Sequence, residues 1–158
     1  MRLWFDTEFH EDGRTIDLIS IGIVCEDGRT YHGVSAAYDW RRATPWLLQN
    51  VRPHIASMTP VSRDQLRADI AHLIGDAQPE FWAYFGEYDW IALRQLFGDM
   101  LNWPKGWPLC HLDIEQWRIS LGGVELPPQA SSLHDALSDA LWTRDSWRYL
   151  ESIERARR

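Results

Sequence analysis

Four carboxylates and one histidine stand at spacings that would let one fold gather them around metal ions. Asp6 and Glu8 lie two residues apart in an apolar run near the N-terminus, so the alternation of a strand would point both to one face. Asp89 lies in mid-chain, and His134 and Asp139 lie five residues apart near the C-terminus. Carboxylates that converge repel each other unless a cation lies between them, and oxygen ligands suit Mg2+ or Mn2+. The pattern predicts a metal-dependent phosphodiester hydrolase.

Each part of this pattern is common for structural reasons alone. A carboxylate in the first turn of a helix, as expected for Asp89, is favoured by the helix dipole without any metal. Asp135 and Glu87 are acidic neighbours of the same kind, and we exclude them because they fall between the motif positions. The prediction depends on the conjunction of five residues of suitable types, in order, on suitable elements.

The first third of the chain predicts three antiparallel strands. Residues 3–8 form the first strand, with Thr7 facing away from the two carboxylates. Residues 16–24, rich in Ile and Val, suit a central strand that is buried on both faces. Asp27-Gly28 is typical of a hairpin turn, so residues 30–38 would return as the third strand.

Two helices follow. Thr44 and Pro45 match an N-cap and the first helical position of a short helix. Ser62 and Gln65 match a capping box at the start of a second helix, which Gly75 would end. The apolar stripe of that helix comprises Leu66, Ile70, Leu73 and Ile74.

The rest of the chain alternates strands with helices. Residues 80–85 predict a strand, with Asp89 in the first turn of the next helix. Residues 109–112 predict a last short strand, and Asp113 would cap a helix. The final helix should run from about residue 135 to near residue 155. These elements predict one α/β domain over residues 1–158, with a mixed sheet and helices on its faces.

His134 and Asp139 would not share a face if both were inside that final helix. Five residues of ideal helix rotate by about 500°, which leaves the two side chains about 140° apart. We therefore expect His134 on the loop before the helix and Asp139 one turn inside it, so that both face the sheet.

These motifs resemble the DEDDh branch of the DEDD 3′–5′ exonuclease superfamily, which includes ribonuclease T and oligoribonuclease-like enzymes. The family pattern is Asp-x-Glu on the first strand, an Asp before a helix in mid-chain, and His-x4-Asp at the last helix; the matching residues are Asp6, Glu8, Asp89, His134 and Asp139. The Asp-Thr-Glu-Phe and Gly-x-Tyr-Asp segments look most like small stand-alone mycobacterial exoribonucleases. The resemblance implies a ribonuclease H-like fold, and it covers nearly the whole chain.

The resemblance also implies a reaction. RNA would be hydrolysed from its 3′ end to nucleoside 5′-monophosphates with two metal ions, Mg2+ or Mn2+. Asp6, Glu8 and Asp139 would hold the first ion, Asp6 would bridge to the second, and Asp89 would support that second ion. His134 would take the proton from the attacking water, as suits an imidazole near neutral pH. Relatives are often homodimers.

Two aromatic residues are our candidates for stacking on a substrate base. Phe9 follows the first acidic pair and Trp90 follows Asp89, so both should lie near the metal ions. The chain departs from the family at Phe85, where many relatives have an Asn four residues before the middle Asp. That departure puts any substrate contact made by the Asn in doubt.

Composition narrows the class of protein. The formal net charge of −7 argues against a protein that coats nucleic acid through a broad basic face, although metal ions could meet a phosphate instead. No apolar run approaches the roughly 18 residues of a membrane span, so we expect a soluble protein without an anchor. Cys25 and Cys110 have no CxxC spacing, which fits the cytoplasm.

Three other functions remain open from the residues alone. A 3′–5′ DNA exonuclease would use the same ligands, because no motif reports a contact to the 2′-hydroxyl group. A metal-dependent phosphatase or small-nucleotide hydrolase would also use them. A nucleotide- or RNA-binding module without turnover is less favoured, because all four carboxylates and the histidine are present.

Overall fold

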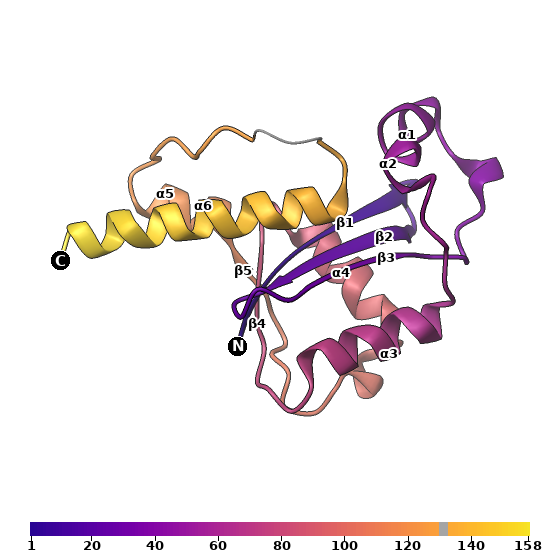
Figure 1. The fold of residues 1–158 in the computed structure, drawn as a ribbon, viewed down its shortest axis with the longest axis horizontal. Helices are drawn as coiled ribbons and strands as arrows, with labels where there is room; N and C mark the ends of the chain where they lie inside the picture. Colours follow the sequence, from indigo (N-terminus) through magenta and orange to yellow (C-terminus); the bar gives the residue numbers. More distant parts are fainter. Residues whose placement is uncertain (130–132) are drawn as a thin grey trace.

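A five-stranded mixed sheet lies at the centre of the molecule (Figure 1), in a computed structural model that describes residues 1–129 and 133–158. Its strand order is β3-β2-β1-β4-β5. The strands are β1 (Arg2–Glu11), β2 (Ile16–Cys25), β3 (Thr30–Val34), β4 (Glu80–Ala83) and β5 (Leu112–Asp113). The first three pair antiparallel, and β4 and β5 are added in parallel. The predicted α/β architecture is confirmed.

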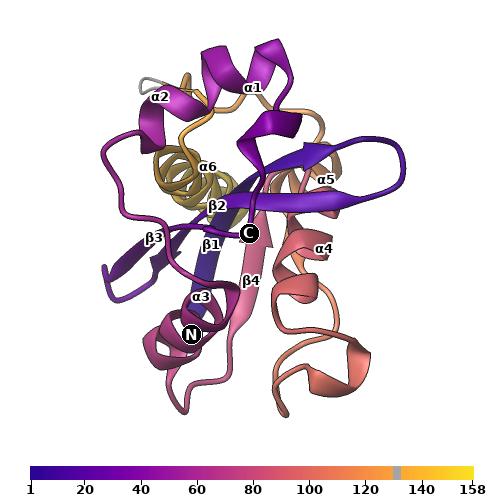
Figure 2. The ribbon, with the colours of Figure 1, turned by 90° about the vertical axis from the view of Figure 1, so that its right-hand side faces the viewer.

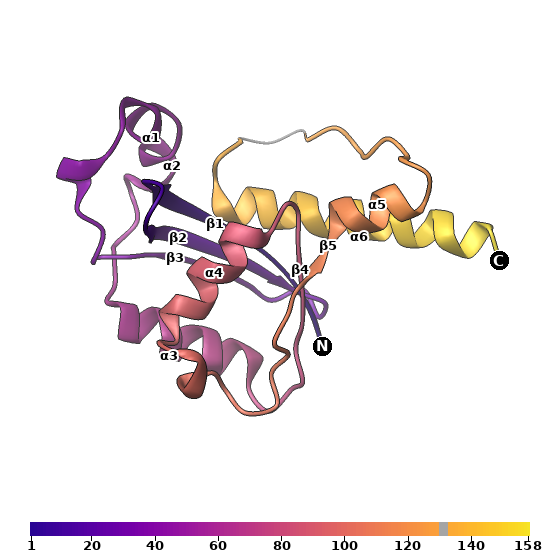
Figure 3. The same cartoon turned by 180° about the vertical axis from the view of Figure 1, so that it is seen from behind.

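Helices cover both faces of this sheet. The helical segments are η1 (Trp40–Arg42), α1 (Pro45–Asn50), α2 (Arg52–Ile55), α3 (Arg63–Ile74), α4 (Glu87–Leu96), η2 (Met100–Asn102), α5 (Ile114–Ser120) and α6 (Ala136–Ala156). α3 and α4 pack on one face, and α5 and α6 pack side by side on the other (Figure 3). α1 and α2 lie at the end of the sheet where β1 ends, close to the start of α6 (Figures 1 and 2).

Successive residues of β1 face opposite layers, which explains why its apolar run is continuous. Leu3 and Phe5 are fully buried against the α3–α4 layer. Trp4 is buried in the α5–α6 layer, where its ring meets Trp147 edge-on at 5.5 Å between centroids. A strand covered on both faces needs apolar side chains on both.

Local capping follows the sequence. The side chains of Thr44, Ser62 and Asp113 accept hydrogen bonds from backbone N–H groups at the starts of α1, α3 and α5. The capping box of α3 is only half formed, because the amide of Gln65 donates to Asp69 instead of returning to Ser62. Four predicted strand boundaries are wrong by two to four residues, since β1 continues to Glu11, β3 stops at Val34, β4 stops at Ala83 and β5 begins only at Leu112.

A β-bulge opposite the second carboxylate anchors the segment that follows β3. Glu8 pairs with Ser20 but Phe9 pairs with Leu18, so Ile19 is an extra residue in β2. Ile19 is fully buried in a cluster with Val34 and with apolar residues of α1 and α2. The bulge therefore gives α1 and α2 their own small core beside the carboxylates.

Within the described parts of the chain, no helix is both long enough and apolar enough to cross a bilayer.

Candidate active site

Asp6 and Glu8 lie on the face of β1 that is covered by α6. They have the same parity along the strand as Trp4, which packs against that helix. Gly22, the register partner of Asp6 on β2, lets the start of α6 approach, because a Cβ atom there would lie 2.2 Å from the carbonyl oxygen of Ala136. The two carboxylates and the first turn of α6 are thereby brought together.

The start of α6 presents His134 and Asp139 as the sequence predicts. His134 lies in the turn before the helix with a φ of 66°, and Asp135 is the N-cap, accepting from the N–H of Ser138. The backbone N–H of His134 donates to Oδ2 of Asp139 at 3.0 Å, and the Gln129 amide donates to Oδ1. Asp139 is held in place by these two donors. Ala136, not residue 135, begins the helix.

Asp89 reaches the site from the opposite layer. It lies in the first turn of α4 and is buried, with 6% exposure. Thr7 donates to its Oδ1 twice, through the backbone N–H at 2.8 Å and through the side-chain hydroxyl at 2.7 Å. Because Thr7 faces away from Asp6 and Glu8, it can hold Asp89 at the sheet edge while those two carboxylates point to α6.

These residues line one open cavity of about 390 Å³. Its acidic side contains all four predicted carboxylates and His134, drawn from β1, α4 and the start of α6. Its other walls are largely aromatic, with Phe9, Trp46, Tyr84 and Trp142. None of the described residues that line it is Lys or Arg.

The carboxylates are protonated more readily than usual. Burial, and then the charges of Asp89, Glu8 and Asp139, raise the pKa of Asp6 well above its usual value. Burial followed by the charge of Asp139 raises the pKa of Glu8 to about 8. Burial also raises the pKa of Asp89 to about 6, against the hydrogen bonds from Thr7, which lower it. Ionised together, these groups would repel each other strongly.

The donor set fits a divalent cation. In the part of the chain that the structure describes, none of the four carboxylates pairs with Lys or Arg, although surface acids elsewhere commonly do. Glu8, His134 and Asp139 each offer a ligand atom within 4.8 Å of the other two. Carboxylate oxygens with uncompensated charge are what Mg2+ and Mn2+ prefer.

Of the two residues predicted to stack on a base, Phe9 lies at the cavity and Trp90 does not. Phe9 lines the cavity and its ring is stacked on Tyr88, with 5.7 Å between centroids and 14° between planes. Trp90 does not line the cavity; its ring packs against Phe5 and Phe81 in the α3–α4 core. One residue after Asp89 on a helix, its side chain is rotated by about 100° from the carboxylate. The geometry therefore does not support substrate contact by Trp90.

Sequence reasoning missed Thr7 and Trp46. Strand alternation correctly turned Thr7 away from the acidic pair, but only the packing of α4 shows that it meets Asp89. Trp46 lines the cavity and its ring meets that of His134 edge-on, at 4.6 Å and 74°. No pattern around Trp46 distinguishes it from the other nine tryptophans.

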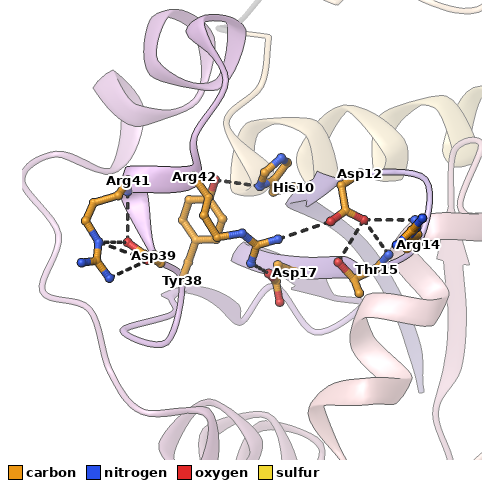
Figure 4. A network of polar contacts seen from close by, with 9 residues as sticks. All are labelled: His10, Asp12, Arg14, Thr15, Asp17, Tyr38, Asp39, Arg41 and Arg42. Carbon is orange, nitrogen blue, oxygen red and sulfur yellow. Dashed lines mark hydrogen bonds and ion pairs between the residues drawn. The ribbon is translucent and has the colours of Figure 1, made fainter.

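A polar network ties the segment that carries Trp46 to the β1–β2 hairpin (Figure 4). The Arg42 guanidinium lies between Asp17 and Asp12, at 3.5 Å from the latter. In the same network, the hydroxyl of the buried Tyr38 is hydrogen-bonded to Nδ1 of His10 at 3.1 Å. Arg41, by contrast, pairs with Asp39 inside its own segment. Arg42 is thus the ion-pair link between the hairpin and η1.

Comparisons with known proteins agree with this geometry. Residues 1–151 match a family model described as a 3′–5′ exoribonuclease Rv2179c-like domain. The chain is 40% identical over 164 residues to the 3′–5′ exoribonuclease Rv2179c of Mycobacterium tuberculosis strain H37Rv, and the match covers 100% of this chain and 98% of that protein. The 3′–5′ exoribonuclease MT2234.1 of strain CDC 1551 matches with the same values.

Solved structures of exonuclease I share the fold. The apo form superposes with a TM-score of 0.68 at 14% identity, and a product-bound form with a TM-score of 0.67 at 14% identity. The match covers 96% of this chain but only 42% and 43% of those chains. At this identity the likeness establishes the ribonuclease H-like fold alone.

Proposed function

The chain belongs to the Rv2179c-like family of 3′–5′ exoribonuclease domains, and we propose that the acidic cavity is where it hydrolyses RNA. The predicted resemblance to the DEDD exonucleases and the predicted exoribonuclease activity are confirmed at the level of this family. The observation that supports the assignment to the cavity is the convergence of Asp6, Glu8, Asp89, His134 and Asp139 from three separate segments.

Asp6, Glu8 and Asp139 would hold one divalent cation, and Asp6 and Asp89 a second, either Mg2+ or Mn2+. Bound there, the cations would neutralise the carboxylates and stabilise the charge that develops on the scissile phosphate. A set of oxygen donors without Lys or Arg among the described lining residues supports this role.

His134 would accept the proton of the attacking water. It stands beside Asp139 at the cavity, and its ring is supported by the edge of Trp46. Phe9 would stack on the terminal base, since its ring lines the cavity and is buttressed by Tyr88. The leaving product would be a nucleoside 5′-monophosphate.

The test is a time course on a 5′-labelled RNA and on the DNA of the same sequence, with Mg2+, with Mn2+ and with chelator, beside Asp139→Ala. We expect a metal-dependent ladder that shortens RNA from its 3′ end and is absent in the variant. Faster degradation of the DNA would move the assignment to a DNA exonuclease. If both polymers stay intact although the protein binds metal, the remaining candidate functions are a mononucleotide hydrolase and a binding module.

Localisation and assembly are further proposals. We propose a cytoplasmic protein, supported by two free cysteines, of which Cys25 is buried and Cys110 exposed. A homodimer, as the family resemblance implies, would be detected by light scattering.

A further inference from the structure

Phe85, in the turn between β4 and α4, combines two features that folding alone does not favour. Its φ is 51°, in the left-handed region where a bulky side chain is strained. Its side chain is also 57% exposed, so burial does little to offset that strain. A strained backbone that displays a large apolar side chain to solvent indicates a contact with something outside the fold.

The turn is imposed by its surroundings. The N–H of Gly86 donates to Oδ2 of Asp113 at 3.1 Å, which ties the turn to the end of β5. A Cβ atom at Gly86 would lie 2.4 Å from the Cβ atom of Ala83, so the chain is closely packed there. The left-handed conformation at residue 85 is therefore set by its neighbours, and the aromatic side chain is not what produces it.

Phe85 lies next to the aromatic wall of the cavity. Its ring lies 4.6 Å from that of Tyr84, which lines the cavity. Tyr88, in the first turn of α4, is 49% exposed and stacks on Phe9, which also lines the cavity. The exposed aromatic surface on the α4 side is thus continuous with the site.

We propose that Phe85 stacks on the nucleobase next to the 3′-terminal nucleotide, which makes it a specificity-determining residue for single-stranded 3′ ends. This inference rests on the proposed function. The cavity, at about 390 Å³, is open, and Phe85 lies against its lining residue Tyr84, so a base that follows the terminal nucleotide out of the cavity would reach the Phe85 ring. Because the described lining contains no Lys or Arg, stacking would add affinity that basic side chains of the lining do not supply.

The test compares Phe85→Asn with Phe85→Leu, Phe85→Trp and the control Leu101→Asn. Asn tolerates a left-handed backbone, so Phe85→Asn should raise Tm while it raises KM for a short RNA roughly tenfold at unchanged kcat. Phe85→Leu should show the same rise in KM, because it keeps apolar area but no ring face, and Phe85→Trp should keep the wild-type KM. Leu101→Asn should leave KM unchanged, because Leu101 is 93% exposed in η2 and does not line the cavity.

A second arm repeats the kinetics on RNA that carries an abasic penultimate nucleotide. We expect wild type and Phe85→Asn to have equal KM on that substrate, because the stacking partner is gone. A KM for Phe85→Asn equal to wild type on intact RNA, or an equal loss on both substrates, would overturn the inference. Absence of RNA hydrolysis by the wild type would instead refute the proposed function, so the two failures are distinguishable.

Discussion

Thr7 acts on the site through Asp89. The backbone N–H and the hydroxyl of Thr7 both donate to Oδ1 of Asp89. The other oxygen, Oδ2, is left for another partner. Hydrogen bonds to a carboxylate favour its ionised form, which opposes the rise in pKa that burial causes. Thr7 is therefore a positioning residue for a proposed metal ligand.

Thr7→Val removes the hydroxyl donor and keeps the backbone donor. Because this hydrogen bond orients a proposed metal ligand, we expect its loss to weaken Mg2+ binding about tenfold. The measurement is a Mg2+ titration of Tm without substrate, paired with the Mg2+ dependence of the rate. Thr7→Ser keeps the hydroxyl and should restore the wild-type midpoint. Identical midpoints for the Val variant and wild type would remove the role assigned to Thr7.

The helical segments η1, α1 and α2 form an arm, residues 40–55, beside the site. The arm packs on Ile19, which the β-bulge supplies, and it carries Trp46 to His134. Arg42 adds ion pairs from η1 to the hairpin. Exposed ion pairs contribute about 0–1 kcal/mol, so Arg42 should affect the mobility of the arm more than global stability.

Arg42→Ala should change the free energy of unfolding by less than about 1 kcal/mol. Backbone amides of residues 40–50 should exchange faster with deuterium, and kcat/KM should fall a few-fold because Trp46 is less firmly held at His134. Arg41→Ala is the matched control, since the ion pair that Arg41 forms with Asp39 lies within its own segment. Equal exchange rates in the two variants would show that Arg42 does not hold the arm.

The carboxylate cluster opposes folding of the domain when it is ionised. The folded-state pKa of Glu8 is raised to about 8, and burial also raises that of Asp6. Between about pH 4.5, the ordinary pKa of a Glu, and pH 8, Glu8 therefore binds more protons in the folded state than in the unfolded state, and its contribution to stability falls as pH rises. Divalent cations at the proposed site would bind the folded state alone and should reverse this loss.

In chelator, the free energy of unfolding should fall by about 1 kcal/mol between pH 7 and 8, measured by denaturant titration. Burial lowers the pKa of His32 and of His111, so these two groups change the stability at pH values below this window. Glu8→Gln should flatten the slope, and millimolar Mg2+ should raise Tm more at pH 8 than at pH 7. A stability that rises with pH in chelator would contradict the assignment.

Sequence alone determined the features that depend on neighbours along the chain. Alternation placed Asp6 and Glu8 on one face, capping residues such as Thr44 and Asp113 started helices, and helical rotation required His134 to precede the helix that carries Asp139. These follow from backbone periods of two and 3.6 residues, which act over a few positions. The same helical period, applied to Trp90, would have turned it away from Asp89.

Contacts between distant segments depend on how the helices and strands pack together. The bond from Thr7 to Asp89 spans 82 residues, and Trp46 meets His134 across the arm and the start of α6. The left-handed turn at Phe85 depends on Asp113 and on the close packing of Gly86. Such contacts arise when separate elements pack together in three dimensions, and no local period of the chain encodes them.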